Sequence, residues 1–83
     1  MNATSRKTKY EINQGSFTTD DGESYTSYGI TAFNLANGTK TMLKQIEDIS
    51  TDYNFVNELV SKFNKFDLHI EHFLDVVTDE TDT

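Results

Sequence analysis

The stretch YTSYGITAFNL fills residues 25–35 and is followed by Ala36 and the pair Asn37-Gly38, and this passage decides the fold. It is rich in aromatic and β-branched residues, which favour strands. Its apolar residues fall on both alternations: Tyr25, Phe33 and Leu35 on one, and Tyr28, Ile30 and Ala32 on the other. A strand that is apolar on both faces is usually central or covered on both sides. Asn-Gly is a strong signal for a two-residue hairpin, so another strand is expected after it.

The segments on either side of this passage also have the composition of strands. Residues 10–14 alternate apolar and polar side chains, and the turn Thr19-Asp20-Asp21-Gly22 joins them to the central passage. Residues 39–49 form a third candidate strand, with Met42 and Ile46 expected to face inward and Leu43 as a further candidate. The first half of the chain therefore predicts a three-stranded antiparallel meander.

The second half has the period of amphipathic helices. Residues 50–52 are all good N-cap types. The apolar stripe that follows consists of Phe55, Val56, Leu59, Val60 and Phe63. Residues 64–66 end this helix, and Asp67 is a candidate cap for a second one. The second stripe consists of Ile70, Phe73, Leu74 and Val77. The predicted fold is α+β in the order βββαα, with both helices packed on one face of the sheet.

The length of 83 residues is enough for one small domain. We expect a single α+β domain at residues 9–78, a flexible N-terminal arm at 1–8 and an acidic tail at 79–83. Cysteine is absent, which excludes disulfides and thiolate chemistry. Because no signal peptide or apolar run of membrane-spanning length is visible, we expect a cytoplasmic protein that does not bind membranes.

Negative charge is concentrated in the second half of the chain. The whole sequence has seven Lys or Arg and fourteen Asp or Glu residues, for a formal net charge of −7. Residues 45–83 contain two lysines and ten acidic residues. Direct binding to nucleic acid or to an anionic membrane is disfavoured, because both are polyanions. The favoured partner is a basic protein surface, a nuclease being one candidate.

Four acidic residues recur every fourth position: Asp67, Glu71, Asp75 and Asp79. On a helix this spacing makes a slowly drifting stripe with a rise of about 6 Å per step, close to the ~6.8 Å that two nucleotides of one DNA strand rise. Together with Glu58, these residues are the candidate partner-binding set, in which carboxylates imitate phosphates. The more common explanation of such a stripe is a solvated face that keeps the protein soluble.

The sequence lacks the usual patterns of catalysis and cofactor binding. His69 and His72 are three residues apart, whereas the metalloprotease helix needs histidines four apart with a glutamate after the first. No serine has a nucleophile-elbow context, and the four glycines form no phosphate-binding loop. The tyrosines and phenylalanines of the strands lack a basic groove beside them, so core packing is favoured over base stacking. We therefore expect no enzyme activity, no cofactor and no metal.

The segments DISTD at residues 48–52 and HFLDVV at 72–77, together with YTSYGI at 25–30, carry a family resemblance. Across residues 8–79 the chain resembles a family of short uncharacterised bacterial proteins of Firmicutes type. In size and charge it is also similar to phage-encoded inhibitors of CRISPR or restriction enzymes. The resemblance implies a fold class and a bacterial or phage origin.

Two functions follow as hypotheses. The first is a small acidic, non-enzymatic protein that inhibits or regulates a basic nucleic-acid-binding protein. The alternative is a structural or adaptor module, homodimeric through an apolar sheet face that includes Tyr25, Tyr28 and Ile30.

Overall fold

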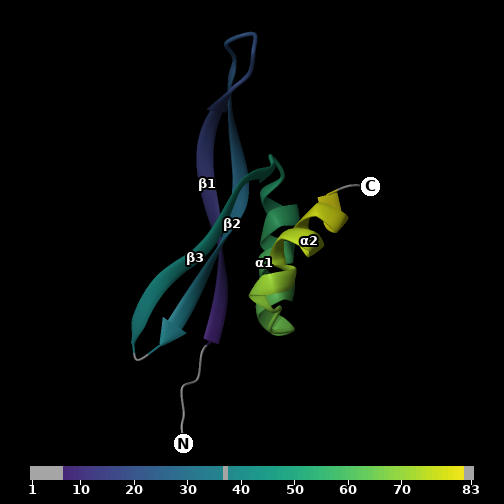
Figure 1. Ribbon diagram of the computed structural model, residues 1–83. Helices are drawn as coiled ribbons and strands as arrows, with labels where there is room; N and C mark the ends of the chain where they lie inside the picture. Colours follow the sequence, from purple (N-terminus) through teal and green to yellow (C-terminus); the bar gives the residue numbers. More distant parts are fainter. Residues whose placement is uncertain (1–6, 37, 82–83) are drawn as a thin grey trace, which may run out of the picture.

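The structure is a computed structural model, and it describes residues 7–36 and 38–81. The element order is β1 (Lys7–Thr18), β2 (Ser24–Ala36), β3 (Thr39–Ser50), α1 (Tyr53–Lys65) and α2 (Ile70–Thr81). The strands form one antiparallel sheet in the order β1-β2-β3, so β2 is central. Both helices lie on the same side of the sheet (Figure 1). The predicted βββαα fold is therefore confirmed.

The β1–β2 hairpin projects beyond the rest of the molecule. β1 and β2 pair from Lys7↔Leu35 to Thr18↔Ser24, whereas β3 pairs with β2 only from Tyr28 onward. The upper part of the hairpin is therefore a two-stranded ribbon that extends past the helices (Figure 1), and the molecule measures 56 × 26 × 19 Å. At its tip, Gly22 adopts a φ of 86° and donates its N–H to the Thr19 carbonyl, as expected for a turn.

The secondary structure reaches past both expected domain boundaries. Lys7 and Thr8 belong to β1 because they pair with β2, and residues 79–81 belong to α2. The last turn of α2 is held by the Thr81 hydroxyl, which donates to the Val77 carbonyl at 2.9 Å. Residues 1–6 of the expected arm, Asn37 of the expected hairpin turn and residues 82–83 of the expected tail lie outside the described residues.

β3 is irregular, and this overturns one expectation about its inward residues. Its register with β2 shifts between Ala32 and Phe33, where Leu43 is the extra residue. Met42 pairs with Phe33 on the face away from the helices and is 57% exposed, so the expectation that it faces inward was wrong. One inserted residue shifts the inward–outward alternation of a strand by one position. Even-numbered residues before the insertion and even-numbered residues after it therefore lie on opposite faces of the sheet. Ile46 does pack against the core, as expected.

A second, larger bulge in β3 explains Gly29 in the central strand. Tyr28 pairs with Ser50 but Ile30 pairs with Ile46, so β3 contains two extra residues there. Its main chain at Ile46 and Glu47 crosses directly over Gly29, and a Cβ atom at position 29 would collide with the Ile46 carbonyl oxygen. Glycine is therefore required at this position by close backbone approach.

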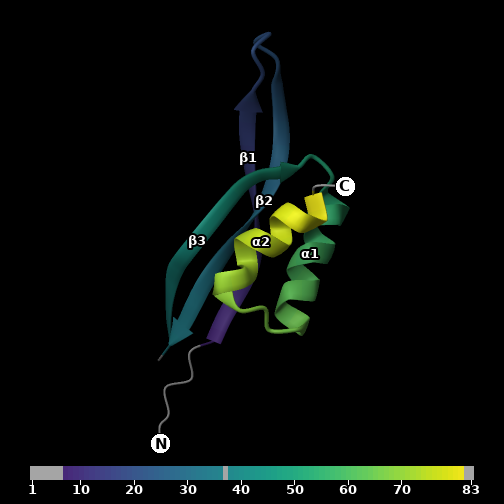
Figure 2. The ribbon, with the colours of Figure 1, turned by 45° about the vertical axis from the view of Figure 1, so that its right-hand side comes forward.

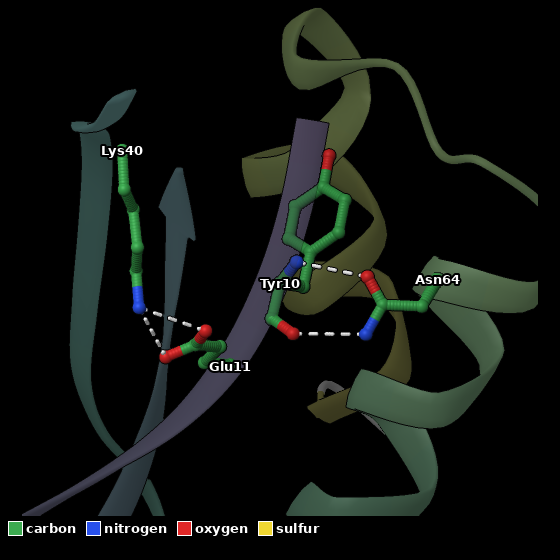
Figure 3. Close-up of polar contacts among 4 residues, drawn as sticks. All are labelled: Tyr10, Glu11, Lys40 and Asn64. Atoms are coloured by element: carbon green, nitrogen blue, oxygen red, sulfur yellow. Dashed lines mark hydrogen bonds and ion pairs between the residues drawn. The ribbon is translucent and has the colours of Figure 1, made fainter. Parts of the chain in front are cut away.

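The core lies between the sheet and the helices and is organised around Tyr10. The Tyr10 ring contacts the rings of Phe63 and Phe73 at centroid distances of 5.4 and 5.1 Å. Its hydroxyl donates to the Leu68 carbonyl at 2.7 Å in the α1–α2 loop. The main chain of Tyr10 exchanges two hydrogen bonds of 2.8 Å with the Asn64 side-chain amide (Figure 3). One residue of β1 thus contacts both helices and the loop that joins them.

The remaining core comes from the two predicted helical stripes. Val56, Leu59, Val60 and Phe63 of α1 and Phe73 and Val77 of α2 are buried, as expected. Leu74 is different, because it is 48% exposed although its position in the stripe predicted burial. Burial of each such side chain contributes roughly 1.5–3 kcal/mol, so α2 is held mainly by Phe73 and Val77.

The junction between the helices differs from the prediction at Asp67. The Asp52 carboxylate caps α1 by accepting from the N–H groups of Asn54 and Phe55, as one of three predicted candidates. Asp67 does not cap α2; it adopts a φ of 54° just after α1 ends. Its N–H donates to the Asn64 carbonyl, and the next N–H donates to the Phe63 carbonyl. This is the Schellman pattern of a helix C-terminus.

Candidate protein-interaction surface

The acidic residues predicted to bind a partner divide into one ridge and two separate positions. Glu71, Asp75 and Asp79 all lie on α2 and are exposed, and we call these three residues the acidic ridge. They follow one another at successive helical turns. Asp67 lies in the loop before α2, so it is not part of the helical stripe that its spacing predicted. Glu58 is exposed on α1.

These five carboxylates form no ion pair within the part of the chain that the structure describes. The ion pairs found there join Lys40 to Glu11 on the sheet and Lys62 to Glu80 between the helices. The second pair replaces the contact between Glu58 and Lys62 that their i, i+4 spacing favours. The acidic ridge therefore presents negative charge to solvent, and no basic side chain of the described residues neutralises it.

The helix layer has a larger excess of negative charge than the sheet, whose residues 7–50 contain six acidic residues and four lysines. Residues 52–81 contain seven acidic residues and two lysines, Lys62 and Lys65. On the open face of the sheet, the Lys40 ammonium contacts both Glu11 oxygens at 2.9 and 3.1 Å (Figure 3). The same ammonium lies 4.2 Å from the centre of the Phe33 ring. Most of the excess negative charge is thus in the helical part of the chain.

The predicted alternative interface is divided between the two faces of the sheet. Ile30 is fully buried beneath the helices. The Tyr28 ring packs against Tyr53 of α1 at 5.2 Å, also on the helical side. Tyr25 points to the open face, where its hydroxyl donates to the Asp48 carboxylate at 2.8 Å. Because a strand presents alternate side chains to opposite faces, these three residues do not form one open surface.

Asp48 is the other residue with an unusual backbone, at a φ of 55° in the bulge of β3. The hydroxyl groups of Ser27 and Tyr25 hold the pKa of the Asp48 carboxyl below its usual value. The hydrogen bond to Asp48 in turn raises the pKa of the Tyr25 phenol. These contacts hold the bulge of β3 against β2.

The two histidines lie at the start of α2. His69 precedes the helix, and its Nδ1 accepts the Glu71 N–H at 3.3 Å, so it occupies the capping position that Asp67 was expected to take. The rings of His69 and His72 are 6.1 Å apart. Within residues 7–36 and 38–81, no cluster of three or more His, Cys, Asp or Glu residues is arranged to hold a metal.

A hollow that the sequence did not indicate lies beside the start of α2. Its volume is about 250 Å³, and it is lined by Thr8, Asn34, Leu43, Asp67, Leu68, His69 and Ile70. Leu43 reaches this place only because it is the bulged residue of β3. The residue types around Leu43 do not reveal that the strand contains an extra residue there. The sequence therefore gives no local signal for this hollow.

The fold and surface define a small α+β domain with a three-stranded meander, two helices on one face and an acidic helical layer. The chain belongs to the family of unknown function DUF6514, whose model matches residues 1–83. The expected membership of an uncharacterised family is therefore confirmed, and the match extends beyond the expected 8–79. No curated protein and no solved structure matches the chain. In the described residues, no helix has the length and apolar character needed to cross a membrane.

Proposed function

We propose that this protein is a small, non-enzymatic, acidic binding protein of the cytoplasm that inhibits or regulates a basic nucleic-acid-binding protein. The observation that carries the proposal is the acidic ridge, whose three exposed carboxylates have no ion-pair partner in the described part of the chain. Complementary potential speeds association and makes it sensitive to salt. An inhibitor of a CRISPR or restriction nuclease, encoded by a phage or mobile element, is an example of this class.

The ridge would act by occupying a surface that normally binds phosphates. Successive carboxylates on a helix rise about 6 Å per four residues, which is similar to the ~6.8 Å rise of two nucleotides. Like charges at this spacing disfavour a helix by a few tenths of a kcal/mol per pair. Asp75 and Asp79 also lie near the C-terminus of α2, where the helix dipole disfavours negative charge. A binding role would give these residues a function that offsets their cost to the helix.

The test is capture of proteins from a bacterial lysate on the immobilised protein, with and without excess duplex DNA. The key variant reverses Glu71, Asp75 and Asp79 to lysine. The matched control reverses Asp20, Asp21 and Glu23, three exposed acids near the hairpin tip, and changes the net charge by the same amount.

We expect the wild-type protein and the hairpin control to retain a nucleic-acid-binding protein that duplex DNA displaces, and the ridge variant to lose it. Equal loss in both variants would show that net charge alone matters. A partner that is indifferent to DNA, or to the ridge variant, would contradict the proposal.

The adaptor alternative predicts a homodimer, which sedimentation of the purified protein would detect. Ile30 is buried and Tyr28 packs against Tyr53. These two residues therefore do not form the open dimer interface that the sequence suggested. No observation favours it over the acidic binding protein.

A further inference from the structure

The hollow beside α2 continues into a strip of exposed apolar side chains. Leu43, Leu68 and Ile70 line the hollow. Leu74 lies one helical turn after Ile70 on the same side of α2, and we call these four residues the apolar trough. Leu43 and Leu74 are 46% and 48% exposed. Single exposed apolar residues are common on protein surfaces, but Leu43 borders a cavity, and Leu74 follows Ile70, which lines the same cavity, by one helical turn.

The trough lies between α2 and β3. A different side of α2 faces α1, where Glu80 pairs with Lys62 at 3.3 Å. Figure 2 shows α2 between α1 and β3. Ile70 lines the hollow together with Leu43 of β3, and Leu74, one turn further along, lies on the same side of α2.

The acidic ridge borders the trough on its solvent side. Each residue of a helix is rotated by about 100° from the one before it. Glu71 therefore follows Ile70 and Asp75 follows Leu74 around the outer surface of α2. On the β3 side, the basic residue next to Leu43 is Lys44. An apolar strip with carboxylates along one border is complementary to a surface that has apolar and basic residues side by side.

We propose that the apolar trough and the acidic ridge together bind an amphipathic basic helix of the partner protein. Its apolar side chains, spaced three and four residues apart, would fill the trough, and its Lys or Arg residues would meet the ridge. The inference rests on the proposed function and adds the shape of the partner segment. It predicts that binding energy comes from apolar burial as well as charge.

Two other occupants fit less well. A strand added to β3 would need a regular edge, but Leu43 is itself the bulged residue that interrupts the ladder. A second copy of this chain would place one acidic ridge against another acidic helical layer, and like charges across an interface disfavour association. A helix of opposite charge meets neither obstacle.

The probe is a labelled synthetic peptide of about five helical turns that contains only Leu and Lys, with leucines at helical spacing. The control peptide has the same composition with its leucines scattered, so that its charge is identical and its apolar face is lost. Affinity is measured by fluorescence anisotropy with the full chain, and the binding surface is mapped from amide shifts in NMR spectra.

We expect the patterned peptide to bind at least about tenfold more tightly than the scattered one. The variants Leu43→Ala and Leu74→Ala should each weaken binding several-fold, and both replace half-exposed side chains, so the fold is retained. Met42→Ala is the matched control, because Met42 is adjacent in sequence but lies on the opposite face of β3. Lys44→Glu should tighten binding.

The outcomes separate this inference from the proposed function. Equal affinity for both peptides, or unchanged affinity in the leucine variants, would show that the apolar trough does not contribute to binding. The inference would then be wrong, and charge alone would account for the binding. Loss of binding in the leucine variants together with full binding by the ridge variant would show that the trough binds without the ridge, which would overturn both the proposed function and the role that this inference gives the ridge. Binding of neither peptide, or shifts confined to the outer edge of β3, would overturn the inference.

Discussion

The two faces of β2 are both apolar in sequence, yet they are covered by different means. On the helical side, Ile30 and Ala32 are completely buried against α1 and α2. On the open side, Phe33 lies under the Lys40 ammonium. Thr31 on the same side is buried and accepts a hydrogen bond of 2.9 Å from the Asn13 amide. One face is closed by apolar packing and the other by polar side chains of the neighbouring strands.

This difference shows that apolar alternation locates a central strand without telling which face the helices cover. It also indicates that contacts on the helical side contribute most of the free energy that stabilises the domain. Apolar burial contributes more than exposed ion pairs, which are worth about 0.2–1 kcal/mol. The five substitutions below test this ranking, from the largest expected effect to the smallest.

Phe73→Ala should have the largest effect. Phe73 is fully buried between Tyr10 and Phe63, and such truncations cost about 3–5 kcal/mol. For a domain of this size, that loss is comparable to the whole free energy of unfolding. Urea denaturation followed by circular dichroism measures it. The neighbouring Leu74→Ala is the control and should cost less than about 1 kcal/mol; similar losses would contradict the assigned orientation of α2.

Gly29→Ala should be the next most destabilising change, by about 1–3 kcal/mol or more, because the new methyl group must displace the β3 main chain. The bulge should move, so amide shifts in NMR spectra should be centred on Ile46 and Glu47. Thr26→Ala, at an exposed position in the same strand, serves as the control. An unchanged spectrum around Ile46 would mean that the two strands do not approach as closely as described.

Tyr10→Phe and Tyr25→Phe compare a hydroxyl on each face. The first leaves the Leu68 carbonyl without its donor and should cost about 1–3 kcal/mol. Burial, with a smaller effect of Asp67, raises the pKa of Tyr10 above its ordinary value of 10.0. The unfolded chain therefore loses this proton first, so the stability from Tyr10 is complete below about pH 10 and is lost above it.

The alkaline loss of stability should become smaller in Tyr10→Phe, as thermal unfolding across that pH range would show. Tyr25→Phe should cost less at neutral pH, because its hydrogen bond to Asp48 is exposed. It should also raise the pKa of Asp48 toward its usual value, which an NMR titration measures. The ranking of the two faces is contradicted if Tyr25→Phe is the more costly change at neutral pH.

Glu11→Gln should have the smallest effect, about 0.2–1 kcal/mol, because its ion pair with Lys40 is more than a third exposed on both sides. A double-mutant cycle with Lys40→Met isolates the pair energy. Added salt should reduce that energy. A coupling well above this range would show that the open face contributes more than its exposure indicates.

Much of the fold was predictable from local residue patterns. The turn at Gly22, the central position of β2 and the N-cap at Asp52 all follow from chemistry within a few residues. These features confirmed the expected βββαα order. The acidic ridge was predictable for the same reason, since helical spacing alone places Glu71, Asp75 and Asp79 together.

The errors occur where distant segments meet. The extra residues in β3 reverse the orientation of Met42 and bring Leu43 to the hollow, and nothing in their residue types announces this. Asp67 was expected to cap α2, but it adopts a positive φ, which aspartate tolerates better than most residues. The hydrogen bonds between Asn64 and Tyr10 span 54 residues. No window-based pattern detects such a contact.

The Asn64 amide has one further consequence, for the growth of the sheet. β1 is an edge strand, and at Tyr10 both of its outward backbone groups are already bonded to Asn64 (Figure 3). A side chain thus imitates one residue of a fourth strand. Any incoming chain must first displace it, and exposed strand edges are the usual templates for aggregation. A single side chain of α1 therefore blocks the addition of a strand at this point of the edge.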